Sequence, residues 1–516
     1  MPDIRELLNV PPGQRKAVLC FGFGHSRGVY PADRSDPSPG EAFVEVMKRR
    51  FARDHFSIVV GPVLTAKYLR TVMDVGAFID HRSVPIEARG RWGGLERPGI
   101  PTHAIVAEVE KCVERYARHD GLDRWQWRRA TMETVGFWAE VMSAFDEVFY
   151  LCGNVPHVFD DLIAYRVAQA LGHPTLCLYR LPILPRLSVR TMIFEDIFRQ
   201  DRPLPLPNGA TPPALGPDDL AEVMRRLAGA PPSPAPSAAQ PGGSGVSVAA
   251  AKPAPARRAT GQKLLRGLKA VQRRIRNRTL RAEMFEAGRV WREYRGHVTH
   301  TLPDRFVYYP LHMQPEASSH PLGGIYGDQE MLVHHLVEAL PEGVKLVVKD
   351  HPLQLSSIDR LATRGRGFYA RMAADPRIVL LHHSVPPRTL LPRCLAAVTL
   401  TGTTALEALA MGKPCFVMGA SPFVRAPNAL VPRDHAALCG MMQALAEGRV
   451  PPVRAAETTA YLDWLRAHSV FGYVDPYTHP QLEGLFSQDD NIAAVTTALC
   501  AAIDQIRARQ TAPVDA

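Results

Sequence analysis

The chain lacks the segments that would carry it into or across a membrane. No apolar run reaches about 18 residues, the length that spans a bilayer. Met1 leads into the charged residues Asp3, Arg5 and Glu6, so the start does not read as a signal peptide. We therefore expect a cytoplasmic protein.

Paired cysteines and metal-binding histidine motifs are also missing. The eight cysteines are scattered and none forms a C-x-x-C pair. None of the 19 histidines stands in an H-x-x-x-H or H-E-x-x-H pattern. Buried reduced thiols are therefore expected, and a structural zinc site is not.

What is present is the composition of a folded protein with more than one domain. The 516 residues exceed what one hydrophobic core usually organises. Hydrophobic residues make up 46% and charged residues 22%, as in ordinary globular proteins. We expect two domains plus connecting material.

Positive charge is concentrated in one segment. The net charge is +10, and residues 263 to 295 hold eleven Lys or Arg against three Glu. A helical pattern there places five apolar residues on one side: Leu264, Leu265, Leu268, Val271 and Ile275. Such a helix suits an anionic membrane surface, or it packs on a domain with its arginines in water. No helix-turn-helix or zinc-finger motif accompanies it, so we expect no nucleic-acid partner.

Two regions alternate strands with helices, which indicates α/β domains with mainly parallel sheets. In the first, strands are expected at 17–23, 56–60, 147–152 and 175–178. In the second, they are expected at 306–310, 345–349, 378–381, 396–400 and 415–418. The fold class is thus two Rossmann-like, doubly wound domains.

The stretch between them is rich in Pro, Ala, Gly and Ser, including PPSPAPSAAQPGGSG, and indicates a linker. We divide the chain into an N-terminal domain (1–201), a linker (202–262), a basic amphipathic helix (263–299), a C-terminal domain (300–490) and a C-terminal helix with its tail (491–516).

Polar residues follow the strands of the second domain, where parallel sheets bind ligands. They are His312, Gln314 and Glu316 after the first strand, Lys349 to His351 around the end of the second, His382, His383 and Ser384 after the third, and Thr401 to Thr404 after the fourth. The strand ends point these groups toward one crevice.

A strand passes through the small residues Thr401, Gly402, Thr403 and Thr404 directly into a helix. Free amides, hydroxyls and the helix dipole at such a turn suit a phosphate, and Glu407 one turn later could accept hydrogen bonds from ribose hydroxyls. An ordinary capped helix is the alternative.

The segment Lys349-Asp-His-Pro places His351 at a strand end, with Pro352 fixing the turn. A histidine there can donate to a phosphate oxygen or act as an acid, although a structural role is also common at strand ends.

In the first domain, the glycines of FGFGHSRG miss the G-x-G-x-x-G spacing, so we infer no dinucleotide cofactor. His157 and Asp161 lie four residues apart where a strand gives way to a helix. We expect them to face the interdomain cleft as acid, base or acceptor ligands, or else to mark an acidic helix start.

Four segments carry a family resemblance: PLHMQPEASSHPLGGIYGDQ, LPEGVKLVVKDHP, TGTTALEALAMGKPCFVMG and NVPHVFDDLIAYRVAQALG. The chain resembles the bacterial capsule polysaccharide biosynthesis family that includes Kdo transferases. The resemblance implies a GT-B fold, with the nucleotide sugar bound by the C-terminal domain and the acceptor by the N-terminal one.

The resemblance also assigns roles. It makes His351 and Pro352 the His-Pro motif that contacts the nucleotide phosphate, and Thr401 to Thr404 the loop that grips the nucleotide. His312, Gln314 and Glu316 match the family's polar cluster. It implies a metal-independent glycosyltransferase without a permanently bound cofactor, using a nucleotide sugar, with CMP-Kdo as a candidate donor.

The expected role is therefore sugar transfer to a capsule or other surface polysaccharide or glycolipid, connected with polysaccharide export. We assign His157, Asp161, His312 and Glu316 to catalysis. We assign to the nucleotide sugar Gln314, Lys349, His351, Pro352, Ser384, Thr401, Gly402, Thr403, Thr404 and Glu407. Alternatives are a non-catalytic carbohydrate-binding or export-assembly protein, a nucleotide-sugar epimerase, or a polyol-phosphate transferase. The sugar, linkage, acceptor and oligomeric state stay open, as does contact with the inner face of the cytoplasmic membrane.

Overall fold

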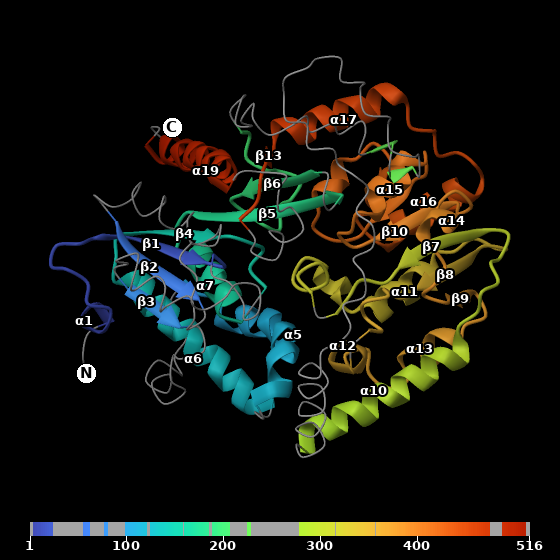
Figure 1. Ribbon diagram of the computed structural model, residues 1–516, viewed down its shortest axis with the longest axis horizontal. Coiled ribbons are helices and arrows are strands. Elements are labelled where there is room, and N and C mark those ends of the chain that lie inside the picture. Colours follow the sequence, from blue (N-terminus) through green and yellow to red (C-terminus); the bar gives the residue numbers. More distant parts are fainter. Residues whose placement is uncertain are drawn as a thin grey trace, which may run out of the picture.

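Two α/β sheets with helices around them make up the protein (Figure 1). The computed structural model describes residues 4–23, 55–61, 77–80, 99–120, 124–157, 159–184, 188–206, 224–225, 227–228, 278–314, 316–356, 358–474 and 488–511. The predicted linker after residue 206 and the basic segment before residue 278 lie almost entirely outside these ranges, as do residues 24–28 of the glycine-rich loop.

The first sheet has the strand order of a classical Rossmann domain, with two antiparallel strands added at one edge. Its strands are β1 (Lys16–Phe21), β2 (Phe56–Gly61), β3 (Ala77–Asp80), β4 (Glu147–Cys152), β5 (Thr175–Leu184), β6 (Ser188–Phe194) and β13 (Val470–Phe471). They run in the order β13-β6-β5-β4-β1-β2-β3. From β5 to β3 all neighbours are parallel, whereas β6 is antiparallel to both β5 and β13. The helices of this part are α1 (Ile4–Leu7), α5 (Thr102–Asp120), α6 (Arg124–Ser143) and α7 (Phe159–Ala170).

The second sheet is wholly parallel and has the same order. Its strands are β7 (Phe306–Pro310), β8 (Lys345–Lys349), β9 (Ile378–Leu381), β10 (Ala396–Thr399), β11 (Cys415–Val417) and β12 (Ala429–Leu430), in the order β12-β11-β10-β7-β8-β9. The order reverses between β7 and β10, which is where ligands bind in such sheets. The predicted class, two Rossmann-like doubly wound sheets, is confirmed.

Helices and short 3-10 turns surround the second sheet. They are α10 (Arg278–His297), η1 (Gly324–Gly327), α11 (Gln329–Glu338), α12 (Ile358–Ala362), α13 (Phe368–Ala373), α14 (Pro387–Leu390), α15 (Thr404–Ala410), η2 (Pro422–Arg425), α16 (His435–Ala446) and α17 (Ala455–Ala467). The described part of the basic helix is α10, which lies along α12 and α13 at one side of this sheet (Figure 1). Ala287, Val290 and Tyr294 on α10 are buried in the core of the second sheet.

The chain returns to the first sheet after the second is complete. Val470 and Phe471 pair with β6, although they lie within the range predicted for the C-terminal domain. The last helix, α19 (Gln488–Thr511), then packs Val495, Leu499 and Ile503 into the core beside β13 and β6. This segment joins the two sheets physically, and the exact limits of the two domains stay a prediction.

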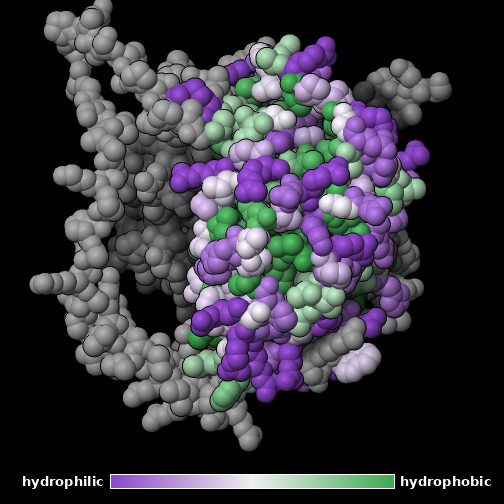
Figure 2. All heavy atoms as spheres, turned by 90° about the vertical axis from the view of Figure 1, so that its right-hand side faces the viewer, coloured by the Kyte–Doolittle hydropathy of each residue, from purple (hydrophilic) through white to green (hydrophobic). Residues whose placement is uncertain are grey.

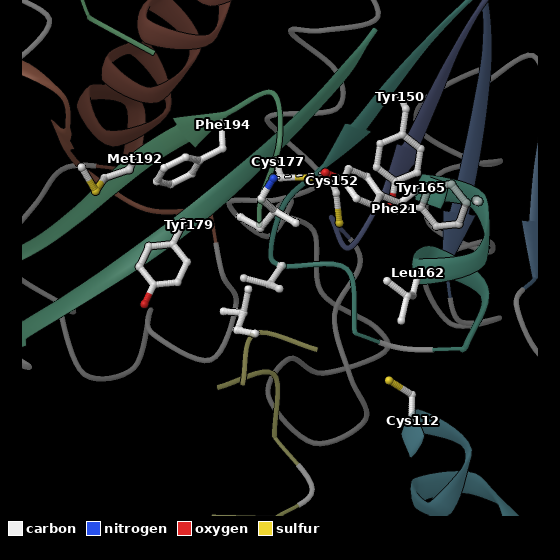
Figure 3. Packing of buried hydrophobic residues seen from close by; sticks show 14 of the residues in the cluster. Phe21, Cys112, Tyr150, Cys152, Leu162, Tyr165, Cys177, Tyr179, Met192 and Phe194 are labelled. Atoms are coloured by element: carbon white, nitrogen blue, oxygen red, sulfur yellow. Dashed lines mark hydrogen bonds between the residues drawn. The ribbon is translucent and has the colours of Figure 1, made fainter. Parts of the chain in front are cut away.

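The core of the first sheet is aromatic and contains thiols (Figure 3). The rings of Phe21 and Tyr150 stack with centroids 5.2 Å apart, and the Tyr165 ring meets Tyr150 edge-on at 5.6 Å. Cys152 and Cys177 are buried among them. All eight cysteines are free, as expected, and the expected burial is found for six of them.

Within the described residues, no helix combines the length and apolar character needed to cross a bilayer. The face on the right of Figure 1 carries hydrophilic residues interspersed with small hydrophobic patches (Figure 2). No continuous apolar band crosses that face.

Candidate functional site

A cavity of about 870 Å³ lies between the two sheets. Residues after β7, β8, β9 and β10 line one side, and residues from β5 and the loop after β4 line the other. Twelve of the fourteen predicted site residues line it: His157, His312, Glu316, Lys349, His351, Pro352, Ser384, Thr401, Gly402, Thr403, Thr404 and Glu407. Its volume falls within the range of about 300 to 1,000 Å³ that is typical of small-molecule binding pockets.

His312 sits at the point where the strand order of the second sheet reverses. Its Nε2 lies 3.0 Å from Thr399 Oγ1 and accepts the Leu400 N–H at 3.1 Å. Because Nε2 is the acceptor, the neutral ring carries its proton on Nδ1. Burial lowers the pKa of His312 to about 4, so the ring is uncharged at pH 7. His312 therefore suits a hydrogen-bond donor, and its predicted place in catalysis stays a prediction.

Gly402 makes this close arrangement possible. A Cβ at residue 402 would lie 2.9 Å from Thr399 Oγ1 and 3.1 Å from His312 Cε1. The Gly402 N–H also donates to Thr399 Oγ1 at 2.9 Å. A larger residue would displace the His312 ring or the turn.

A buried ion pair supports the strand ends from behind. Arg364 donates to both carboxylate oxygens of Asp350, at 2.9 and 2.7 Å, and both side chains are fully buried. Arg364 also donates to the His312 carbonyl at 2.8 Å, and Tyr369 donates to Asp350 at 2.5 Å. The turns holding His312 and His351 are thus fixed to one buried guanidinium.

Gln314 belongs to this scaffold and does not line the cavity. Its N–H donates to Gln354 at 2.7 Å, its side-chain amide donates to the Gly327 carbonyl at 2.6 Å, and its Oε1 accepts from Arg364 at 3.0 Å. The side-chain oxygen and nitrogen of Gln314 thus have protein partners, and its binding of the nucleotide sugar stays a prediction.

His351 is held in a defined tautomer at the edge of the cavity. Its backbone N–H donates to Asp350 at 2.7 Å, and its Nδ1 accepts the Leu353 N–H at 3.1 Å. The neutral ring therefore carries its proton on Nε2. Burial lowers the pKa of His351, which favours this neutral donor form.

A cluster of polar side chains in the cavity wall consists of Lys349, Glu407, Thr403 and Tyr308. Burial lowers the pKa of Lys349, and Asp350 and Glu407 oppose that shift. Burial raises the pKa of Glu407, opposed by a hydrogen bond from Thr403 (3.2 Å) and by Lys349. The Tyr308 hydroxyl is buried and has no hydrogen-bond partner among the described residues. A buried donor without a partner is costly, so a ligand or water would satisfy it.

Two hydroxyl groups in the turn before α15 already donate hydrogen bonds within the protein. Thr401 donates through its hydroxyl to the Ser318 carbonyl at 3.0 Å. Thr403 is the residue before the first turn of α15, and its side chain makes no capping hydrogen bond to the helix. The sequence predicted hydroxyls free for phosphate, whereas those of Thr401 and Thr403 are already used within the protein.

The first domain places His157 at the cavity but not Asp161. Helix α7 begins only at Phe159, so the four-residue helical spacing does not apply to this pair. Asp161 is buried near Cys152, whose pKa is raised by burial and further by the Asp161 carboxylate. The expected shared orientation of His157 and Asp161 toward the cleft is therefore not found.

His157 is oriented by the backbone beside it. Its Nδ1 lies 2.5 Å from the Val155 carbonyl, which can only accept, so Nδ1 carries the proton. In the neutral ring Nε2 is then the basic nitrogen.

Three further polar residues of the first domain line the cavity and were not predicted: Asn154, Tyr179 and Arg180. Tyr179 and Arg180 lie beyond residue 178, where the strand was expected to end, because β5 continues to Leu184 in a hairpin with β6. Figure 3 shows the Tyr179 hydroxyl turned away from the Tyr150 and Tyr165 rings. The length of the apolar run in LYRLPIL was the available signal.

Residues 318–426 match the family model described as capsule polysaccharide biosynthesis protein. The search of the curated proteins found no match. The matched segment includes the turn after β7 from Ser318 onward, Lys349, His351 and the turn before α15.

Solved structures align with the chain only loosely. The β-Kdo 2,7-transferase KpsC of Thermosulfurimonas dismutans aligns at 11% identity and a TM-score of 0.26, covering 69% of this chain and 96% of that one. The UDP-GlcNAc 2-epimerase of Methanocaldococcus jannaschii aligns at 10% identity and a TM-score of 0.24, covering 87% and 99%. These scores are too low to bear on function, and the fold rests on the strand orders given above. Within this chain, residues 318–426 are the part that is similar to the capsule polysaccharide biosynthesis family.

Proposed function

We propose that the protein is a glycosyltransferase that moves a sugar from a nucleotide-sugar donor to a capsule or other surface polysaccharide or glycolipid. The observation that carries this proposal is the interdomain cavity. Donor groups held by a buried ion pair converge on the strand-order reversal of the second sheet, and a histidine of the first domain lies across from them. The match of residues 318–426 to a capsule biosynthesis family supports it.

The second domain would bind the nucleotide sugar. His351 and His312 offer one ring N–H each, and Lys349 adds a positive charge beside them. Together they would stabilise the negative charge that develops on the leaving phosphate. Glu407 would accept hydrogen bonds from ribose hydroxyls. A CMP-linked sugar such as CMP-Kdo is the first donor to test, following the family resemblance.

His157 would assist the acceptor from the first domain. As the acceptor hydroxyl oxygen attacks the anomeric carbon, its proton passes to Nε2 of His157, and the bond from that carbon to the phosphate oxygen breaks. The electron pair of this bond leaves with the nucleotide. Glu316 lines the same cavity and is a candidate to position the reacting sugar or its acceptor.

Because Lys349 and two neutral histidines already supply positive charge and donors, we propose turnover without an essential metal. Activity that persists after dialysis against a chelator would support this. Loss of activity that returns with Mg²⁺ or Mn²⁺ would contradict it.

A panel of CMP-, UDP-, GDP- and TDP-sugars tests the proposed function. A ligand that binds only the folded state raises the melting temperature, so the correct donor should stand out. His351→Ala should weaken its binding by roughly 10- to 150-fold, since hydrogen bonds to charged groups contribute about 1.5 to 3 kcal/mol. His334→Ala, an exposed histidine on α11 outside the cavity, is the matched control.

No stabilisation by any nucleotide sugar would refute the proposal. Product analysis with the donor that binds then separates transfer from epimerisation. An altered free nucleotide sugar with no transfer to acceptor would indicate an epimerase.

We also propose peripheral contact with an anionic membrane through the basic helix. Within α10, Phe285 is 76% exposed, and Arg289, Arg292 and Arg295 are exposed as well. Basic residues near such a surface contribute about 1 kcal/mol each. Wild-type protein should sediment with anionic but not neutral vesicles, less so in high salt. Arg289→Gln with Arg292→Gln should reduce binding, and equal sedimentation of variant and wild type would contradict the proposal.

A further inference from the structure

The far end of α10 reaches the wall of the cavity. Tyr294 is 1% exposed, and its hydroxyl oxygen accepts the backbone N–H of His383 at 2.7 Å. The same hydroxyl lies 2.9 Å from His383 Nδ1. His383 lines the cavity, whereas Tyr294 does not.

These two contacts determine where the His383 proton lies. Because a backbone N–H can only donate, it uses a lone pair of the Tyr294 oxygen and leaves the hydroxyl proton for Nδ1. Nδ1 is then an acceptor, and the neutral ring carries its proton on Nε2. Burial lowers the pKa of His383, with Lys349 adding to the shift, so the ring is neutral at pH 7.

Neighbouring rings restrict the imidazole further. The Trp291 ring stacks on Tyr294 with centroids 5.6 Å apart and lies 6.3 Å from the His383 ring. The centroid of the His382 ring lies 4.3 Å from that of the His383 ring. Among the described residues, Nε2 of His383 makes no hydrogen bond, whereas Nδ1 and the backbone N–H both meet the Tyr294 hydroxyl. The ring is thus held in place with one N–H left to a molecule in the cavity.

We infer that Tyr294 is a positioning residue that presents His383 as an Nε2–H donor to an oxygen of the bound nucleotide sugar. The inference rests on the proposed function for the identity of that ligand. It assigns the end of the basic helix to the half of the site that binds the nucleotide sugar, although α10 precedes the first strand of the second sheet. His383 would add a third neutral histidine donor to His312 and His351.

Further hydrogen bonds hold this part of α10 against the second domain. Glu293, beside Tyr294, accepts the N–H groups of Gly367, Tyr369 and Ala370 at 2.8 to 2.9 Å. These groups lie at the start of α13, where a carboxylate is favourable. Tyr294 therefore sits on a segment of α10 that is anchored on two sides.

The first test is the tautomer of His383, read from imidazole nitrogen shifts of ¹⁵N-histidine-labelled protein. In wild type we expect a protonated Nε2 and an unprotonated, hydrogen-bonded Nδ1. Tyr294→Phe should remove the hydrogen bond to Nδ1 and give a mixture of tautomers. A wild-type ring protonated on Nδ1, or a spectrum unchanged in Tyr294→Phe, would overturn the positioning role. This measurement needs no ligand.

The second test is a double-mutant cycle on the binding of the best nucleotide sugar from the panel. Tyr294→Phe should weaken binding by about two- to tenfold, the range for one ordinary hydrogen bond. In a His383→Ala background the same change should have no further effect, because its target ring is gone. Tyr326→Phe is the matched control, since Tyr326 pairs with His335 at 3.2 Å outside the cavity.

Equal losses from Tyr294→Phe in both backgrounds would show a structural effect alone and overturn the inference. Unchanged affinity in Tyr294→Phe would do the same. If no nucleotide sugar binds wild type, the ligand assignment falls together with the proposed function, and the tautomer measurement still decides whether Tyr294 positions His383.

Discussion

The two sides of the cavity are built differently. On the second domain, His312, His351 and Gln314 are all tied directly or through the backbone to the buried Arg364–Asp350 pair. On the first domain, His157 is oriented by the carbonyl of Val155, two residues before it in the chain. A half-site held by a buried network presents a fixed set of hydrogen-bond donors. Such a set would suit the phosphate group, which is common to the proposed nucleotide sugars. On the first-domain side, the contact with the Val155 carbonyl sets the tautomer of the His157 ring.

Breaking the network should give the largest effect. Arg364→Met leaves the Asp350 carboxylate buried without its partner, and removing one member of a buried ion pair costs about 3 to 5 kcal/mol. Chemical denaturation should show this loss in the free energy of unfolding. Arg371→Met removes an ion pair to Glu330 whose arginine is 54% exposed, and should cost less than about 1 kcal/mol. Equal losses in the two variants would contradict the comparison.

Lowering the pH should reduce the stability of the folded protein, because His312 is buried on the second-domain side of the cavity. Its pKa falls from the ordinary 6.5 to about 4 on folding. Between these pH values the unfolded chain binds a proton that the folded protein does not, so stability is complete above pH 6.5 and declines as pH falls toward 4. The loss from this one group reaches about 3 kcal/mol.

The measurement is the free energy of unfolding from pH 8 to pH 4 in wild type and His312→Gln. The variant lacks the titrating ring, so its stability deficit relative to wild type should shrink as pH falls. An exposed-site control, His334→Gln, should follow the wild-type curve. A constant difference between wild type and His312→Gln across this range would show that the ring stays hydrated in the folded state.

On the first-domain side, His157→Ala should reduce kcat by about a hundredfold or more, the range for a general base. Donor affinity should change little, because His157 lies across the cavity from the donor groups. Asp161→Asn should instead alter stability and leave kcat near wild type, since Asp161 is buried outside the cavity. Steady-state kinetics with direct donor binding separates these effects. A loss of kcat from Asp161→Asn equal to that from His157→Ala would revive the paired role.

The sequence predicted the parts of this structure that are local. Strand ends near Pro310, Lys349 and Leu381 follow from apolar runs, and residues directly after them must lie at one edge of a parallel sheet. Lys349 and His351 were found in this way. Arg364 was not, because its contacts to Asp350 and Gln314 cross 14 and 50 residues of sequence. No periodicity encodes such contacts.

Other predictions failed because a residue's position depended on where a helix begins or a strand ends. His157 and Asp161 were paired on helical spacing, but α7 begins after His157. Tyr179 and Arg180 were missed because β5 runs past residue 178 into a hairpin. Tyr294 was placed in the basic helix outside both domains, and its hydrogen bonds to His383 show that the helix reaches the cavity wall. Tertiary contacts set these boundaries, and local propensity does not.

The smallest expected effect is that of Thr403, which the sequence placed directly on the phosphate. Its hydroxyl instead donates to Glu407 at 3.2 Å, so we expect it to act on the ligand through that carboxylate. Thr403→Ala should weaken donor binding at neutral pH by about two- to tenfold, as for one ordinary hydrogen bond. Thr403→Ser, which keeps the hydroxyl, should restore it. Because this hydrogen bond opposes the burial that raises the pKa of Glu407, its loss should raise that pKa further. The carboxylate would then take up a proton at a higher pH, so the binding defect of Thr403→Ala should grow as pH falls. Calorimetric binding at several pH values measures this, and a defect independent of pH would indicate direct contact of Thr403 with the ligand.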